Sequence, residues 1–169
     1  MSINFFDANC QSQTNQPKFG LCDDPPPLEN PAYIDTVDCS KWIAIVENTQ
    51  EIEVIFTTID KCIEILRSDG RIDSRCGGML TYNNNNIIFA ELKERNYRNS
   101  VWIDDGDEQL RKTIAVFINH NNLAIYKSKM AYIANSKKPQ FQYSHKERMQ
   151  KFRTDTGFRL IIQNTIKVS

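Results

Sequence analysis

Residues 76–93 constrain the fold more than any other segment, because two apolar runs there flank four consecutive asparagines. Both runs contain β-branched or aromatic residues and are short enough to form strands. Asparagine tolerates left-handed backbone geometry, so the asparagines at 83–86 suit a tight turn. The sequence therefore predicts a β-hairpin with strands at about 76–82 and 87–93.

Elsewhere the hydrophobic pattern predicts an alternation of strands and helices. Two β-branched runs, 42–46 and 52–56, are separated by a short polar turn and predict a second hairpin. Apolar residues at helical spacing predict helices at 59–66 and 104–118, the second with an acidic first turn. We further expect strands at 123–126, 132–134 and 158–162, the last one closing the domain, and a helix at 146–153. This order indicates an α/β fold.

The first 35 residues differ in composition from the rest of the chain. They hold five of the six prolines, together with Gln, Asn and Ser, and they predict an irregular or extended arm. The total length of 169 residues fits one core, so we expect residues 36–169 to form a single domain. No stretch approaches the roughly 20 apolar residues of a membrane span, and the first residues do not form a secretory signal. A cytoplasmic protein that does not enter the membrane is expected.

The five cysteines predict free thiols. Their number is odd and no two are spaced as Cys-x-x-Cys. The two histidines, His120 and His145, are poorly spaced to complete a structural zinc site. We therefore expect mostly buried, reduced cysteines in a reducing compartment.

Charge is distributed unevenly along a chain whose formal net charge is zero. Residues 1–60 contain two basic and ten acidic side chains, whereas residues 109–169 contain 12 basic and two acidic ones. A basic segment of this kind is typical of a surface that faces a polyanion. The alternative is that the acidic first third folds against it and cancels the field.

The run 87–93 ends in a Glu-x-Lys motif whose two charged residues suit metal-dependent hydrolysis. Alternate residues of a strand point to one face, so Glu91 and Lys93 should lie side by side at the end of an apolar strand. A carboxylate can hold Mg²⁺, whose other ligands are waters and substrate phosphate. A neighbouring lysine can orient or help deprotonate an attacking water. The alternative is a surface ion pair on an edge strand.

In this context the sequence resembles the PD-(D/E)XK superfamily, the restriction-endonuclease-like nucleases. The resemblance covers about residues 58–126, comprising the first helix, the hairpin that ends in Glu91-Leu92-Lys93, the helix with Gln109 and the next strand. It implies an αβββαβ core, with a mixed central sheet flanked by helices, and a nuclease that cuts DNA with Mg²⁺ or Mn²⁺. In the family pattern Glu91 binds the metal, Lys93 is the catalytic lysine and Gln109 is a supporting catalytic contact.

Position 77 departs from that pattern. The family carries an aspartate near the start of the strand before Glu-x-Lys, and this chain has Gly77 there. Loss of one of two carboxylates should weaken metal binding. Asp73 is the first candidate for a second metal ligand, with Asp60 and Glu64 as substitutes. Otherwise the site is degenerate and the fold serves binding alone, or Gly77 is a change that silences an active nuclease.

Basic residues beyond the motif are interleaved with aromatic ones, a combination that suits phosphates and unpaired bases. The residues assigned to nucleic-acid binding are Arg95, Arg98, Lys127, Lys129, Lys137, Lys138, Lys146 and Arg148. DNA is the expected partner of a nuclease, which could act as a homodimer. The alternative function is a non-catalytic module on the same fold, which binds nucleic acid or a protein partner in a defence or mobile-element system.

Overall fold

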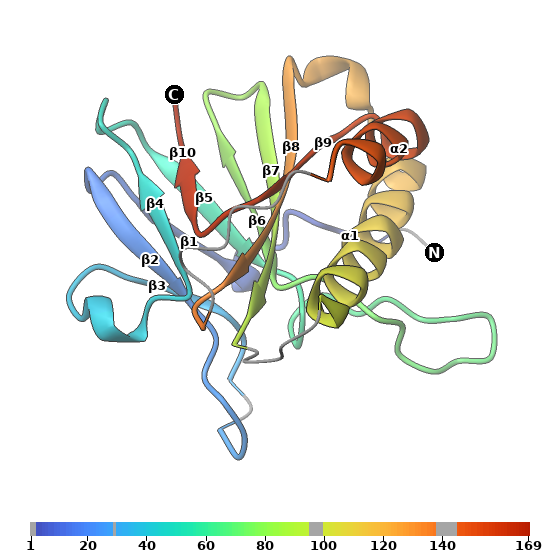
Figure 1. Ribbon diagram of the computed structural model, residues 1–169, viewed down its shortest axis with the longest axis horizontal. Helices are drawn as coiled ribbons and strands as arrows, with labels where there is room; N and C mark the ends of the chain where they lie inside the picture. The colour runs from blue at the N-terminus through green and yellow to red at the C-terminus, as the bar shows by residue number, and fades with distance from the viewer. Residues whose placement is uncertain (1–2, 29, 95–99, 138–144) are drawn as a thin grey trace.

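A computed structural model describes residues 3–28, 30–94, 100–137 and 145–169 of the chain. These residues form two mixed β-sheets and two α-helices, which confirms the predicted α/β class (Figure 1). No helix in the described ranges is both long and apolar enough to cross a membrane.

The larger sheet has six strands in the order β1-β5-β6-β7-β8-β9. Their bounds are β1 Gln11–Thr14, β5 Val54–Thr58, β6 Gly78–Tyr82, β7 Asn86–Lys93, β8 Ser128–Asn135 and β9 Arg159–Ile162. Strands β1, β5, β6 and β7 pair antiparallel, whereas β8 is parallel to both β7 and β9. The parallel step from β7 to β8 is made through helix α1, Val101–His120.

The smaller sheet has four strands in the order β10-β4-β2-β3. Their bounds are β10 Thr165–Lys167, β4 Ala44–Glu47, β2 Lys18–Cys22 and β3 Tyr33–Asp35. Its apolar side chains pack with Phe56, Leu80 and Ile88 of the larger sheet. The two sheets therefore enclose one half of the core.

Helices α1 and α2 (Lys146–Thr156) cover the opposite face of the six-stranded sheet (Figure 1). Strand β7 shows this two-sided burial most clearly, because Ile87 and Phe89 pack on the helix side and Ile88 and Leu92 on the side of the smaller sheet. Such alternation is expected of a central strand. The protein thus has three layers: helices, six-stranded sheet and four-stranded sheet.

Several predicted elements are confirmed. The hairpin of β6 and β7 forms, and its turn uses positive φ angles at Asn83 (52°) and Asn84 (60°). Both predicted helices of the second half form, as α1 and α2. The expected short strand at 132–134 is part of the longer β8, and the strand at 158–162 is β9, which is followed by β10 rather than closing the domain.

Other local predictions are wrong. The runs 42–46 and 52–56 do not pair with each other, since β4 lies in the smaller sheet and β5 in the larger one. Between them, the buried Asn48 side chain donates to the carbonyls of Gln16 and Ile52 and turns the chain away from a hairpin. The predicted strand at 123–126 is a 3-10 helix, Leu123–Ile125, which follows Asn122 as its N-cap.

The predicted helix at 59–66 is also absent. The segment forms turns and one isolated bridge between Leu66 and Ile72, and Lys61 has a left-handed backbone (φ 66°). Ile59 and Ile63 enter the core, but Leu66, which a helix would bury with them, is 47% exposed. The αβββαβ order implied by the resemblance therefore lacks its first helix here.

The N-terminal 35 residues are not an irregular arm. They supply β1 to the edge of the larger sheet, and β2 and β3 to the smaller one. Cys10, immediately before β1, forms a disulfide with Cys62, so the prediction of free thiols is wrong for this pair. Cys22, Cys39 and Cys76 are free, as expected. The first residues are thus tied covalently to the segment after β5.

Candidate functional site

Glu91 and Lys93 lie together at the carboxyl end of β7, on the face that α1 covers. Their side chains are 6% and 9% exposed, and Lys93 Nζ is 3.6 Å from Glu91 Oε2. The strand alternation that predicted a shared face is thus confirmed, and the pair is buried rather than on an edge strand. Buried ion pairs need further hydrogen bonds to offset their loss of hydration.

Gln109 of α1 provides such a hydrogen bond. Its Oε1 accepts from Lys93 Nζ at 2.5 Å, and its Nε2 donates to the carbonyl of Arg75 at 3.3 Å. One turn later, Thr113 Oγ1 accepts from the Cys76 backbone N–H at 2.9 Å. Helix α1 therefore bridges the end of β7 to the residues before β6, and it holds Lys93 in place.

The two oxygens of Glu91 have different surroundings, and Oε2 is the one that faces the Lys93 ammonium. Glu91 Oε1 accepts the Leu92 N–H at 3.0 Å, whereas the buried Oε2 lies 3.6 Å from Lys93 Nζ and accepts no hydrogen bond from the described residues. Burial raises the pKa of the Glu91 carboxyl to about 7, although the Lys93 ammonium and the Leu92 N–H act in the opposite direction. The carboxylates of Asp60 and Asp23 raise this pKa further, which places both acids close enough to influence the site.

This raised pKa predicts a pH-dependent stability. Between pH 4.5 and about 7 the folded protein retains a proton on Glu91 that the unfolded chain has lost, so the free energy of unfolding should fall as the pH rises. The change should be on the order of 3 kcal/mol. Urea unfolding of the wild type and Glu91→Gln at several pH values measures it, because only the wild type should show this fall. The exposed Glu64→Gln serves as the control and should keep the wild-type slope; equal slopes in the wild type and Glu91→Gln would contradict the assignment.

Gly77 adjoins this carboxylate. A Cβ built at position 77 would lie 3.7 Å from Glu91 Oε1 and 3.4 Å from the carbonyl oxygen of Ala90, which is ordinary van der Waals contact. The Gly77 carbonyl accepts the Ile59 N–H at 2.9 Å, so the backbone here is held in place. Position 77 can therefore accept a Cβ, which would lie beside Glu91.

The predicted second acid, Asp73, is engaged elsewhere. Its Oδ1 lies 3.2 Å from Arg67 Nε and 3.5 Å from Lys112 Nζ, and it also accepts the Ser74 N–H. These contacts hold the pKa of Asp73 below its ordinary value despite its partial burial. No described contact joins it to Glu91 or Lys93, so the structure does not bring the predicted metal ligands together.

Asp60 and Glu64 were the substitutes, and they lie differently. Asp60 forms an ion pair with Arg75 at 3.2 Å and influences Glu91 electrostatically. Glu64 is exposed and lines a pocket with Ile3, Asn4 and Asp7. The influence of Asp23 could not be foreseen, because it depends on how the N-terminal strands fold against the sheet.

The residues present fit a metal ion only in part. No group of three or more Asp, Glu, His or Cys side chains in the described ranges is arranged to hold one. Glu91 Oε2 is nevertheless a buried carboxylate oxygen that accepts no hydrogen bond from the described residues, and Mg²⁺ uses one or two carboxylates with waters and substrate phosphates. Of the predicted metal ligands, Glu91 is therefore the one whose surroundings fit such an ion.

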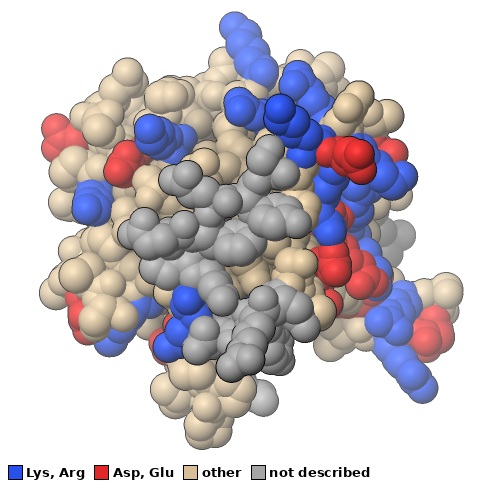
Figure 2. Space-filling model, in the orientation of Figure 1, with Lys and Arg blue, Asp and Glu red and all other residues tan. Residues whose placement is uncertain are grey.

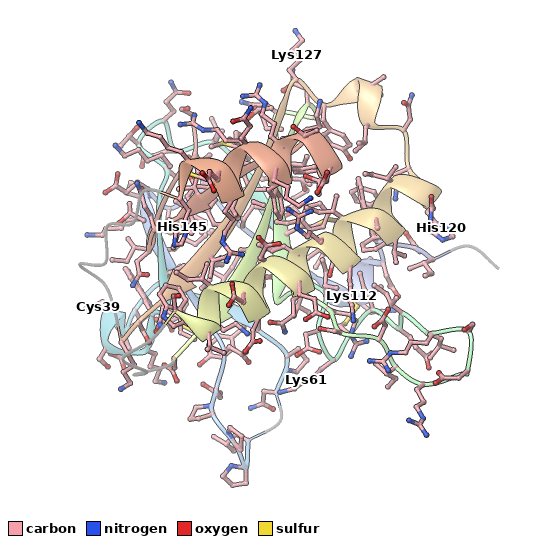
Figure 3. The ribbon with its side chains drawn as sticks, turned by 45° about the vertical axis from the view of Figure 1, so that its right-hand side comes forward. Cys39, Lys61, Lys112, His120, Lys127 and His145 are labelled. Atoms are coloured by element: carbon pink, nitrogen blue, oxygen red, sulfur yellow. A yellow bond between two sulfur atoms is a disulfide. The ribbon has the colours of Figure 1, made fainter. Side chains whose placement is uncertain are left out.

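The predicted nucleic-acid-binding residues that the structure describes are spread over several parts of the fold. Lys137 follows the end of β8 that pairs with Lys93, but Lys127 and Lys129 lie at the opposite end of that strand. Figure 3 shows Lys127 far from Lys61. Lys61 follows Asp60 in sequence, and Asp60 is one of the acids that influence Glu91. On α2, Lys146 is exposed, while Arg148 pairs with Asp104 and Asp107 of α1. Arg95, Arg98 and Lys138 lie outside the described residues.

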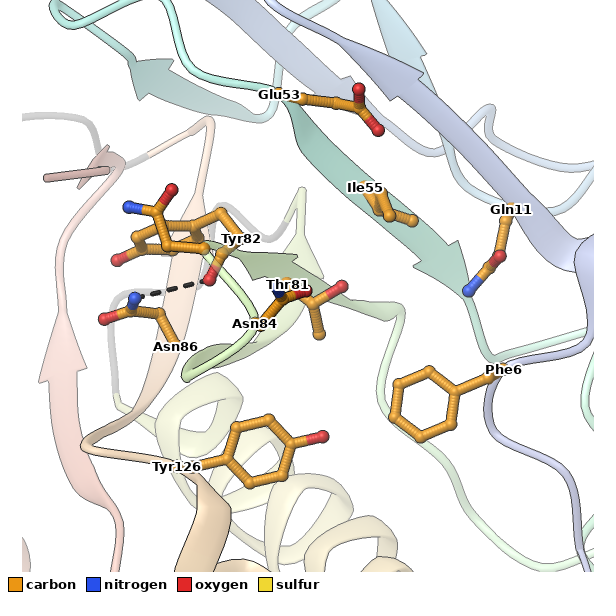
Figure 4. A pocket seen from close by; sticks show the side chains of 10 residues that line it. Phe6, Gln11, Glu53, Ile55, Thr81, Tyr82, Asn84, Asn86 and Tyr126 are labelled. Carbon is orange, nitrogen blue, oxygen red and sulfur yellow. Dashed lines mark hydrogen bonds between the residues drawn. The ribbon is translucent and has the colours of Figure 1, made fainter.

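A separate pocket of about 410 Å³ lies at the turn end of the β6–β7 hairpin (Figure 4). Amide and aromatic side chains dominate its lining, which consists of Phe6, Gln11, Glu53, Ile55, Thr81, Tyr82, Asn83, Asn84, Asn86 and Tyr126. It contains neither Glu91 nor Lys93. This pocket therefore does not support the prediction that Glu91 and Lys93 are catalytic.

Comparison of the chain with protein-family models, with curated proteins and with solved structures finds no match.

Proposed function

We propose that the protein is a Mg²⁺-dependent nuclease of the PD-(D/E)XK type that hydrolyses phosphodiester bonds in DNA, with a metal site weakened by the glycine at position 77. The observation that carries the proposal is the buried cluster of Glu91, Lys93 and Gln109 at the end of β7. The order of β5, β6, β7, α1 and β8 also supports it, because it corresponds to the part of the implied core that follows its first helix.

Each residue has a role that its surroundings suit. Glu91 Oε2 would hold the metal, which supplies a polarised water and offsets charge on the phosphate when bound. Lys93 would orient the attacking water and stabilise the developing negative charge, with Gln109 fixing the position of its ammonium. Because Glu91 is partly protonated near neutral pH, metal binding has to displace a proton, and affinity should rise with pH.

The alternative, a binding module without catalysis, is favoured by a different feature of the same site. Lys93 is already paired with Glu91 and bonded to Gln109, and Gly77 removes the second acid. A closed pair of this kind can stabilise the fold without any metal. In that case the domain would bind DNA or a protein and leave it intact.

The test is a cleavage assay on plasmid and single-stranded DNA with Mg²⁺ or Mn²⁺. We expect slow cleavage by the wild type and rates at least about tenfold lower for Glu91→Gln and Lys93→Met. Asp73→Asn is the matched control, since its ion pairs lie outside the cluster, and it should cut like the wild type. Equal rates for all four proteins would overturn the proposal. DNA binding without any cleavage by the wild type would select the binding module.

A further inference from the structure

Four cations surround a pocket at the end of the sheet opposite to Glu91 and Lys93. Lys127 immediately precedes β8 and Lys129 is its second residue, while Arg153 comes from the last turn of α2 and Arg159 from the start of β9. The pocket has a volume of about 290 Å³, and Ser128, Met130 and Gly157 complete its lining. We call these four residues the basic pocket.

The charge of the basic pocket is not cancelled locally. Within the part of the chain that the structure describes, none of the four cations forms an ion pair, and no acidic side chain lines the pocket. Asp155, two residues after Arg153, lies 2.7 Å from Arg111 and 3.5 Å from Lys151 instead. In the space-filling view, lysine and arginine side chains gather at the top, the end where β8 begins (Figure 2).

A purely structural role explains only part of this cluster. A cation in the last turn of a helix is favourable, and this accounts for Arg153 in α2. Lys129 Nζ donates to the Tyr126 carbonyl at 3.3 Å, which satisfies one of its hydrogens. Lys127 and Arg159 are exposed and have no such partner among the described contacts. Mutual repulsion of four cations costs stability, and an anion placed among them would remove that cost.

The strand register sets the distance between this pocket and the candidate site. Lys93 pairs with Asn135, which lies six residues after Lys129 along β8. At about 3.3 Å per residue the two ends are about 20 Å apart. A duplex strand carries one phosphate per 3.4 Å of its axis, so about six base pairs span this distance.

We infer that Lys127, Lys129, Arg153 and Arg159 form a second contact for the phosphates of DNA, separate from the Glu91–Lys93 site. A duplex held at both places has a phosphate in the basic pocket about six base pairs from the bond presented to Glu91 and Lys93. This inference rests on the proposed function for the identity of the polymer. It does not need cleavage.

The test is DNA binding in the presence of EDTA, which removes the metal and prevents cleavage. Anisotropy of a labelled duplex several helical turns long gives the affinity of wild type and of Lys127→Gln/Arg159→Gln as a function of salt. The control is Lys18→Gln/Lys41→Gln, which removes the same charge from exposed positions outside the pocket. Loss of two phosphate contacts should lower the slope of log K against log salt by about 1.8 and leave the control slope unchanged.

Equal slopes in the two double variants would overturn the inference. The inference would also be overturned if the wild type bound vesicles that contain phosphatidylserine and did not bind the duplex, because the pocket would then contact a lipid surface. Failure of the proposed function would look different: the basic-pocket variant would still lose DNA affinity, while Glu91→Gln and Lys93→Met would leave any cleavage unchanged.

Discussion

Gly77→Asp should increase Mg²⁺-dependent cleavage of DNA by at least about 100-fold over the wild type. A Cβ at position 77 would lie 3.7 Å from Glu91 Oε1, so an aspartate carboxylate could reach the same metal ion as Glu91. Two carboxylates satisfy what Mg²⁺ requires of a protein, with waters and phosphate oxygens completing its octahedron. Adding Lys93→Ala to Gly77→Asp should abolish the gain, because the lysine serves the water and not the metal. A plasmid-nicking time course measures both effects.

Gly77→Asn is the matched control, since it has the shape of aspartate without its charge. It should cut no faster than the wild type. Metal binding can also be measured without cleavage: Mg²⁺ at about 100 times its Kd should raise the free energy of unfolding of Gly77→Asp by about 2.7 kcal/mol and leave Gly77→Asn unchanged. If Gly77→Asp behaves like Gly77→Asn in both measurements, Glu91 is not a metal ligand and the nuclease proposal fails.

The features predicted correctly depend on contacts between residues close in sequence. The hairpin of β6 and β7 follows from two apolar runs around Asn83 and Asn84, and α1 follows from its apolar period. Alternation along β7 placed Glu91 and Lys93 on one face. Gln109 was assigned through the family resemblance, and α1 brings it to Lys93.

The features that were missed depend on pairing between distant segments. Strand β1 pairs with β5 and β2 with β4, and neither partnership leaves a local signal in residues 1–35. Proline and glutamine there reduce the strand signal, but edge strands tolerate such residues. At 59–66, isoleucines at helical spacing are also compatible with a looped segment, in which Lys61 has a positive φ and Leu66 forms a bridge to Ile72.

The distribution of charge around the site could not be predicted for the same reason. In sequence, the basic residues form one segment after residue 109, whereas the parallel pairing of β7 and β8 places Lys127 and Lys129 at the end remote from Lys93. Asp23 belongs to the acidic first third and influences Glu91 only because the N-terminal strands fold against the larger sheet. The alternative reading of the charge distribution, in which the acidic first third cancels the basic last third, therefore does not hold at the basic pocket.

Removal of the Cys10–Cys62 disulfide should lower the free energy of unfolding by about 4 kcal/mol, because the bond spans 52 residues and limits the entropy of the unfolded chain. For a chain of this length the melting temperature should fall by about 10 °C. Thermal unfolding of the wild type with and without a reductant measures this change. Cys10→Ala/Cys62→Ala should have the lower melting temperature under both conditions. Cys39→Ser, at an exposed free cysteine, is the control and should behave like the wild type.

The same bond connects stability to the candidate site. Cys62 lies two residues after Asp60 and three after Ile59, whose N–H donates to the Gly77 carbonyl at 2.9 Å. Reduction frees this segment and loosens the backbone that presents position 77 to Glu91. Reductant should therefore also diminish the stabilisation that Mg²⁺ gives to Gly77→Asp. A reductant-insensitive melting temperature, with both thiols open to alkylation before treatment, would instead show that the two cysteines are not bonded in solution and that the segment is held by its core contacts alone.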